Sequence, residues 1–250
     1  MPPSPPPSAD PAPWLPSTVL LLGTDAAGKN HVADVWIRRL AELGQPLLVQ
    51  EGWLSAPPGE PQGDDEKSWL SKLAEETFLT VFPLLAWALP TILNLLLYRD
   101  LRRFPDDGRR RLVVSHSALR ILAFTLGARG RGEKDLPASS RRALAAFRRR
   151  SRAVVLVLDV DHDVRRRRIE ARRDRGDDDP FDRFMLADGE RSERIEACLV
   201  DLATEDLGAH LIVNDALDDD ALWRELQNAC AAAAGRADSA GQRDAGDPSG

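Results

Sequence analysis

Cysteine is scarce in this chain of 250 residues, which has only two, at positions 198 and 230. Two cysteines cannot build a disulfide framework or a zinc cluster, so small domains stabilised in either way are excluded. No basic segment followed by an apolar one stands near the N-terminus, and a secretory signal is therefore not expected. These absences favour a reducing, cytoplasmic setting.

An excess of positive charge is also missing, because the net charge is −6 at pH 7. Dedicated nucleic-acid-binding domains are usually basic, so we expect no nucleic-acid partner. Nearly all basic residues are Arg, and Lys occurs only at positions 29, 67, 72 and 134. Lys29 is therefore conspicuous where it stands.

Large apolar residues are sparse at both ends of the chain. Residues 1–16 are rich in Pro, which favours an extended, solvated backbone. Residues 234–250 are small and polar and have little to bury. We expect disordered tails over these two segments and one domain over residues 17–233, which is long enough for a sizeable core.

Five short apolar runs predict buried strands at residues 18–22, 46–49, 111–114, 153–158 and 210–213. None alternates clearly between apolar and polar residues, which is typical of a parallel sheet covered on both faces. Helical patterns separate the runs, at residues 30–43, 66–103, 138–150, 161–174, 188–206 and 218–233. This alternation predicts an α/β fold with a doubly wound, five-stranded parallel sheet.

One uncharged stretch, residues 77–98, is long enough to span a bilayer. A single crossing would put Lys29 and the later strands on opposite sides of the membrane, so the sheet could not assemble. Pro83, Pro90 and Asn94 also interrupt the stretch. We favour a buried or subunit-facing helix, kinked near a proline, and expect a homodimer. A segment that lies on a membrane surface is the less favoured alternative.

A glycine-containing loop follows the first predicted strand and matches seven positions of the Walker A pattern G-x-x-x-x-G-K-[ST]. Gly23 and Gly28 allow a close approach of the backbone to a ligand. Backbone N–H groups can then converge on a phosphate at the positive end of the next helix, while Lys29 reaches the outer phosphates. An ordinary turn between a strand and a helix is the alternative. The predicted nucleotide-binding residues are Gly23, Thr24, Asp25, Ala26, Ala27, Gly28, Lys29, Asn30 and His31.

Asn30 stands where this pattern has a Ser or Thr that binds Mg²⁺. An amide oxygen is also a hard, neutral ligand, so Asn30 is a candidate magnesium ligand. Its oxygen lies farther from the backbone than a hydroxyl does, and an octahedral site tolerates such a shift poorly. We expect nucleotide binding to be retained and metal placement to be altered.

Residues 155–184, VLVLDVDHDVRRRRIEARRDRGDDDPFDRF, resemble the corresponding region of thymidylate kinases. A strand ends in an L-D-V-D turn at residues 158–161, and a helix carrying Arg168-Ile169 follows. Lid arginines and an Asp182-Arg183-Phe184 segment come next. The phosphate loop and the turn Gln50-Glu51-Gly52 fall in a similar order. The resemblance covers roughly residues 17–230 and is weak between about 55 and 110.

The resemblance implies a nucleoside monophosphate kinase fold with a lid, and transfer of the γ-phosphoryl group of ATP to a nucleoside monophosphate with Mg²⁺. dTMP is the leading acceptor. Lys29 would act with a lid arginine, Asp25 and Glu51 would face the acceptor or the metal, and Asn214 would lie beside the adenine. The candidate lid arginines are Arg172, Arg173 and Arg175. Alternatively, these arginines pair with Asp177, Asp178 and Asp179 and are a solvated face.

The third predicted strand departs from the family, because Ser115 and His116 replace its Asp and Arg. His116 would contact the acceptor phosphate, or would be a polar residue with no role in catalysis. Two further hypotheses follow from these departures. The protein could bind nucleotide with little or no transfer, or it could be a P-loop kinase for a non-nucleotide, hydrophobic acceptor. A GTPase is disfavoured because no N-K-x-D motif occurs.

Overall fold

The computed structural model describes residues 14–45, 47–55, 89–102, 108–151, 153–215 and 217–244. Five strands form one sheet in the order β2-β3-β1-β4-β5, and all neighbouring strands are parallel. The fold is therefore α/β with a five-stranded parallel sheet, as the apolar runs predict. The strands are β1 (Thr18–Leu22), β2 (Leu48–Gly52), β3 (Arg111–His116), β4 (Val154–Asp159) and β5 (His210–Val213).

Helices connect the strands. Most of the predicted helices are present, but two described helices, α4 and α7, stand in segments for which no helix was predicted. α7 is short and begins at a proline, with the Asp179 carboxylate accepting a hydrogen bond from the backbone of its first turn. The helices are α1 (Lys29–Glu42), α3 (Leu89–Arg102), α4 (Ser117–Gly127), α5 (Ala138–Ser151), α6 (His162–Arg175), α7 (Pro180–Leu186), α8 (Gly189–Asp201) and α9 (Asp219–Asp244), with short turns η1 (Glu133–Asp135) and η2 (Leu202–Asp206).

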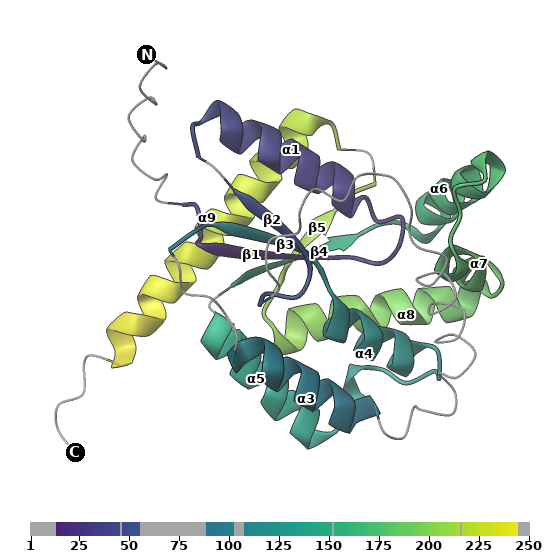
Figure 1. Ribbon diagram of the computed structural model, residues 1–250, viewed down its shortest axis with the longest axis horizontal. Coiled ribbons are helices and arrows are strands. Elements are labelled where there is room, and N and C mark those ends of the chain that lie inside the picture. Colours follow the sequence, from purple (N-terminus) through teal and green to yellow (C-terminus); the bar gives the residue numbers. More distant parts are fainter. Residues whose placement is uncertain are drawn as a thin grey trace, which may run out of the picture.

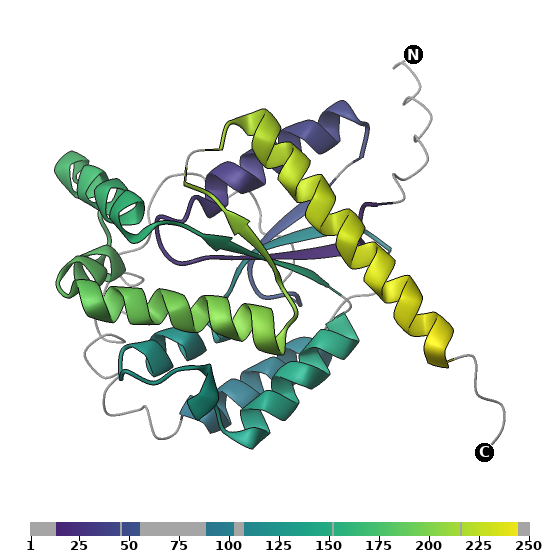
Figure 2. The same ribbon diagram turned by 180° about the vertical axis from the view of Figure 1, so that it is seen from behind.

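Helices cover both faces of the sheet (Figures 1 and 2), and an apolar core lies on each face. Alternate residues of β1 point to opposite faces. Val19 and Leu21 belong to the core beneath α1 and α9, and Leu20 and Leu22 belong to the core beneath α3, α4, α5 and α8. This double coverage explains why the strand residues read as continuous apolar runs.

The N-terminal boundary of the folded part differs from the predicted one. Trp14 and Leu15 pack against the core beneath α1 and α9, and the Trp14 ring meets the Trp223 ring edge-on with centroids 5.7 Å apart. The predicted disordered tail, residues 1–16, therefore includes residues that belong to the folded part of the chain, namely Trp14 and Leu15. Two large apolar side chains outweigh the proline-rich composition around them.

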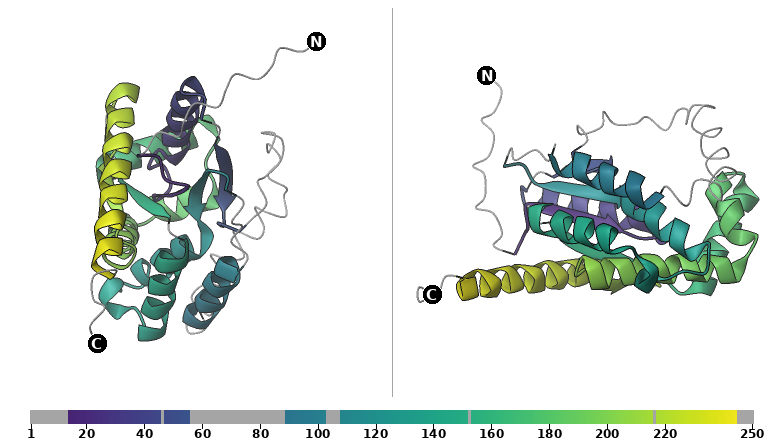
Figure 3. Two further views of the ribbon diagram at one scale, coloured as in Figure 1. Left: turned by 90° about the vertical axis from the view of Figure 1, so that its left-hand side faces the viewer. Right: turned by 90° about the horizontal axis from the view of Figure 1, so that it is seen from below.

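The C-terminal helix is longer than predicted, because α9 continues to Asp244 and extends past the edge of the sheet (Figure 3). This part of the helix lies within the segment 234–250 that its composition marks as a tail. Ala and Arg are good helix formers, and they are frequent there.

The uncharged stretch 77–98 is only partly described, since residues 77–88 lie outside the described ranges. Its second part forms α3, in which Leu93 and Leu97 are buried and Ile92, Leu95 and Tyr98 are exposed. Among the helices that the structure describes, none combines the length and the apolar character needed to cross a bilayer.

Candidate functional site

A pocket of about 810 Å³ lies at the carboxyl ends of β1, β2 and β3. In parallel α/β sheets, ligands bind at this edge, next to the strand where the chain order reverses. β1 is that strand here, because β2 and β3 lie on one side of it and β4 and β5 on the other. The pocket is lined by Asp25, Ala26, Gly28, Lys29, Asn30, His31, Glu51, Gly52, Trp53, Val114, Ser115, Ser117, Arg120, Arg168, Ala171, Arg172, Arg175 and Asp179.

The loop between β1 and α1 has the backbone geometry that its glycines predict. Gly28 has a left-handed φ of 89° and stands directly before α1, whose first turn has no side-chain cap. A Cβ at Gly28 would lie 2.6 Å from Nδ2 of Asn214, so no other residue fits there. The uncapped N–H groups at the start of α1 lie beside the pocket and are suited to an anion.

Lys29 turns its ammonium group into this loop. Its Nζ donates hydrogen bonds to the carbonyl oxygens of Gly23, at 2.9 Å, and Thr24, at 2.6 Å. Burial lowers the pKa of Lys29 to about 8, although the charge of Asp25 acts in the opposite direction. A phosphate entering the loop would meet a cation held by backbone carbonyls.

Asp25 is paired with an arginine for which the sequence predicted no role. Nη2 of Arg120, on α4, donates hydrogen bonds to Oδ1 of Asp25 at 2.8 Å and to Oδ2 at 2.6 Å. Burial alone would raise the pKa of Asp25, but the charges of Arg120 and Lys29 outweigh this effect and hold that pKa below its usual value. Arg120 comes one turn after the end of β3, and this position is the only sequence signal that could have indicated it.

Arg168 on α6 braces the loop from the other side. Its Nη1 donates to the carbonyl oxygen of Ala26 at 3.2 Å, and its Nη2 donates to those of Asn214 at 3.1 Å and Asp215 at 3.3 Å. Nδ2 of Asn214 donates to the carbonyl oxygen of Ala27 at 2.9 Å. Asn214, which the resemblance places beside the adenine, contacts the backbone of this loop in the structure, and Arg168 is a pocket residue that the prediction omitted.

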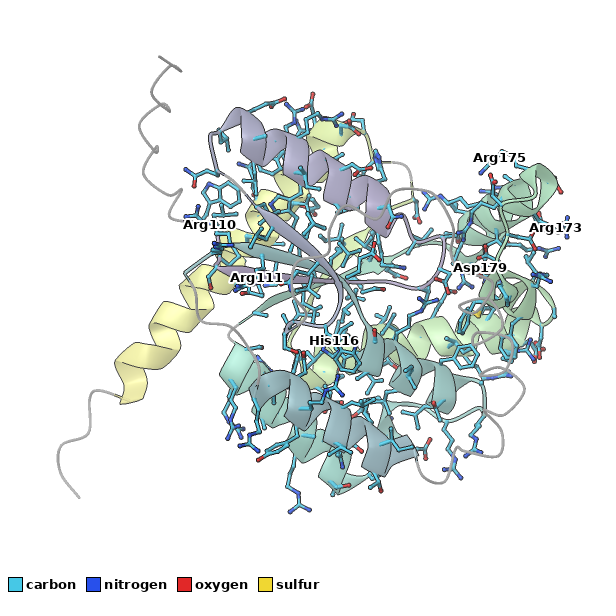
Figure 4. The ribbon with its side chains drawn as sticks, in the orientation of Figure 1. Arg110, Arg111, His116, Arg173, Arg175 and Asp179 are labelled. Carbon is cyan, nitrogen blue, oxygen red and sulfur yellow. The ribbon has the colours of Figure 1, made fainter. Side chains whose placement is uncertain are left out.

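The three predicted lid arginines are not equivalent. Arg172 and Arg175 line the pocket, and Arg173 does not. Arg172 donates to Oδ1 of Asp182 at 2.7 Å, while Arg175 pairs with Asp177 at 3.2 Å. Figure 4 shows Arg173 on the outer side of the lid, and it places Arg110 and Arg111 at the opposite end of the sheet. Arg172 and Arg175 therefore pair with neighbouring acids and also line the pocket.

Asp182 holds Arg172 from a buried position at the base of the lid. Burial raises the pKa of Asp182 to about 6, and the neighbouring charge of Asp179 acts in the same direction. A small apolar cluster joins α4, α6, α7 and α8, and it contains Phe124, Ile169, Met185 and Ile195.

A buried polar network connects the loop between β1 and α1 to α6 and α8. The Thr24 hydroxyl donates to Oε1 of Glu196 at 3.1 Å, and Glu196 pairs with Arg165, which is almost fully buried. Burial raises the pKa of Glu196, although Arg165 and Thr24 act in the opposite direction. Thr24 therefore anchors the loop and does not line the pocket.

His116 is not brought into the pocket. Its side chain is fully buried, with Nε2 3.0 Å from Oδ2 of Asp100, and its ring meets those of Trp53 and Phe147 edge-on at 5.2 Å. The predicted phosphate contact therefore has no geometric support. A backbone turn is the reason, because Ser115 has a left-handed φ of 64° and lines the pocket while the next side chain enters the core.

Glu51, Asn30 and His31 all line the pocket. Asn30 and His31 stand exposed in the first turn of α1, and Nε2 of His31 lies 3.3 Å from Oδ1 of Asp219. Within the described ranges, no group of three or more His, Cys, Asp or Glu side chains is arranged to hold a metal ion. Asn30, the predicted magnesium ligand, lines the pocket beside Lys29.

No protein family model matches this chain, and no curated protein matches it.

Proposed function

We propose that this protein binds ATP in the loop between β1 and α1 and transfers its γ-phosphoryl group to a nucleoside monophosphate, in the manner of a P-loop kinase related to thymidylate kinases. The observation that carries the proposal is the position of Lys29. Its ammonium group is held by two loop carbonyls at the start of an uncapped helix, inside a pocket at the carboxyl edge of a parallel sheet.

The charges around the pocket support a polyanionic ligand. Lys29 enters from the loop, Arg120 from α4, and Arg168, Arg172 and Arg175 from α6. Phosphoryl transfer needs mainly charge compensation and in-line positioning of donor and acceptor, and cations on several sides of a pocket supply both.

The roles divide by element. Lys29 and the first amides of α1 bind the outer phosphates, and Arg172 and Arg175 compensate negative charge from the lid. Arg168 and Asn214 keep the loop in its phosphate-binding shape through their backbone contacts. Mg²⁺, held by the phosphates and Asn30, would add positive charge to the transferred group.

A second candidate is a nucleotide-binding protein with slow or no transfer. The position of His116 favours it, because the residue that replaces the family's acceptor-phosphate arginine is buried against Asp100. dTMP is therefore the first acceptor to test and not the only one.

The test is phosphoryl transfer from labelled ATP to nucleoside monophosphates, nucleosides and lipid alcohols, each with and without Mg²⁺. Transfer to dTMP or another monophosphate supports the proposal. ATP binding without transfer selects the second candidate, and transfer to a lipid alcohol selects a hydrophobic acceptor.

Lys29→Ala is the variant that tests the site, with the exposed Lys134→Ala as its matched control. Loss of one charge-assisted contact should weaken ATP binding roughly 10- to 100-fold. Equal ATP affinity of both variants would overturn the proposed site.

A further inference from the structure

Arg120 differs in origin from the other pocket arginines. Arg168, Arg172 and Arg175 all come from α6, whereas Arg120 comes from α4, directly after β3. Its neighbours along the pocket wall, Ser115 and Ser117, stand at the end of β3 and the start of α4. Arg120 therefore brings a positive charge to the pocket from a different element than the other three arginines.

The contacts of Arg120 leave part of its guanidinium group available. Both hydrogen bonds to Asp25 come from Nη2, and the guanidinium lies over the Phe181 ring at 5.1 Å from the centroid. Nη1 and Nε make no hydrogen bond with the residues that the structure describes. Because guanidinium carries five N–H donors in a fixed plane, it can hold Asp25 and a second anion together.

The pair is not an ordinary surface ion pair. Asp25 is 19% exposed and Arg120 is 37% exposed, and both line the pocket. Arg120 also lowers the pKa of Asp25 against the effect of burial, so the carboxylate stays charged and keeps its hold on the guanidinium. Phe181 supports the guanidinium group from a third element, α7.

The end of β3 supplies no other cation to this part of the pocket among the described residues, because the His116 ring points into the core and Ser115 is neutral. An anionic group on that side would therefore find Arg120 as its partner. A neutral acceptor such as a lipid alcohol would leave the guanidinium without a counter-charge beyond Asp25.

We propose that Arg120 binds the anionic group of the acceptor and that Asp25 is a positioning residue that holds Arg120 in place. The inference rests on the proposed function and deepens it, because it names the residue that binds the phosphate of the acceptor. A charge-assisted hydrogen bond from Nη1 or Nε of Arg120 to the phosphate would supply affinity and help to orient the acceptor for an in-line attack.

The experiment measures binding by calorimetry on the full chain, saturated with a non-hydrolysable ATP analogue. The probes are dTMP, dCMP, AMP and GMP, and the nucleoside of each. Arg120→Met keeps most of the side-chain volume without the charge, and Arg120→Lys keeps the charge without the fork. Arg142→Met is the matched control, since Arg142 is an exposed helical arginine of α5 that does not line the pocket. Melting curves verify that each variant is folded.

We expect Arg120→Met to weaken binding of the monophosphate that the wild type binds most tightly, by roughly 10- to 100-fold. Arg120→Lys should recover part of this loss. Nucleoside binding by Arg120→Met and monophosphate binding by Arg142→Met should stay near wild type. Asp25→Asn should weaken monophosphate binding less than Arg120→Met does. The double variant should bind the monophosphate as well as Arg120→Met alone.

The inference is overturned if Arg120→Met weakens nucleoside binding and monophosphate binding equally, or if it leaves both unchanged. It is also overturned if the wild type binds none of the monophosphates. Repeating the titrations without the analogue separates the two proposals. A wild type that does not bind the analogue contradicts the proposed function, while the comparison of Arg120 variants is still read from the monophosphate data.

Discussion

Lys29 carries its charge into a partly enclosed loop, and that environment determines how the charge depends on pH. Burial lowers its pKa from the ordinary value of 10.5 to about 8. The ammonium group is therefore partly deprotonated in a range where an exposed lysine would stay fully charged. At the scale of single residues, ligand affinity and pH are thus coupled through this side chain.

We expect the affinity of the wild type for ATP to fall as the pH rises above about 8, approaching tenfold per pH unit, because binding to the uncharged amine requires uptake of a proton. Titration of ATP between pH 6.5 and 9.5 measures this slope. Lys29→Arg keeps its proton throughout that range, so its affinity should be nearly flat. Parallel slopes for wild type and Lys29→Arg would contradict the assignment.

Asp182 acts on the lid through Arg172, and its titration offers a second test at the residue scale. Its pKa in the fold, about 6, lies above its ordinary value of 3.8. The folded state therefore binds this proton more tightly than the unfolded state. The contribution of Asp182 to stability is fully present below about pH 4 and is lost as the pH rises through 6.

Replacing Asp182 with Asn removes this titration while keeping an oxygen for Arg172. We expect the free energy of unfolding of the wild type, relative to Asp182→Asn, to increase between pH 7 and pH 4.5. Urea unfolding of both proteins at several pH values measures this difference in free energy. The contributions of the other acidic residues are the same in both proteins and cancel. A difference that does not change with pH would show that Asp182 titrates normally.

At the scale of elements, the crossing of α4 and α8 holds the base of the pocket wall together. Gly127 makes the crossing possible, because a Cβ there would lie 2.5 Å from the Cα of Ile195 and 2.7 Å from the carbonyl oxygen of Arg194. α4 carries Arg120 and α8 carries Glu196, so this close approach also sets where both side chains stand relative to the loop.

Gly127→Ala should therefore push the two helices apart and destabilise the fold by roughly 1–3 kcal/mol. The matched control is Gly132→Ala, where nothing lies within 4 Å of the added Cβ and the φ of −110° suits any residue. Chemical denaturation compares the two variants. Equal stability would mean that the crossing relaxes without cost.

At the scale of the whole molecule, two apolar cores on opposite faces of one sheet hold the pocket-forming loops at its carboxyl edge. Trp14 and Leu15 extend the core beneath α1 and α9 toward the N-terminus, where Trp14 meets Trp223 of α9. The two residues Trp14 and Leu15 before β1 therefore add apolar packing to the fold.

Removing residues 1–16 should lower the free energy of unfolding by roughly 1–3 kcal/mol, because the two apolar side chains leave the core. Removing residues 1–12 keeps both side chains and is the matched control. Thermal and urea unfolding of the two truncated chains measures the difference. Two identical unfolding curves would show that the Trp14 contact adds nothing.

Much of the architecture could be read from local patterns. β1 and β5 begin and end where their apolar runs do, and α1 begins one residue before the predicted helix, because continuous buried runs and a glycine before a helix are local signals. α7 escaped prediction because it is short, and the helix predicted over residues 66–103 lies only partly within the described residues, as α3. The glycine-containing turn between β1 and α1 was also expected from the sequence, because Gly23 directly follows the first apolar run and Gly28 directly precedes the helical pattern.

What the amino-acid order determined by itself was therefore the set of strands, most helices and a glycine-containing loop before α1, all of which depend on neighbours within a few residues. The tertiary structure alone decided the strand order, the pairing of Arg120 with Asp25, the bracing of the loop by Arg168 and Asn214, and the burial of His116 against Asp100. These pairs are far apart along the chain, and only the packing of helices on the sheet brings their side chains within hydrogen-bonding distance.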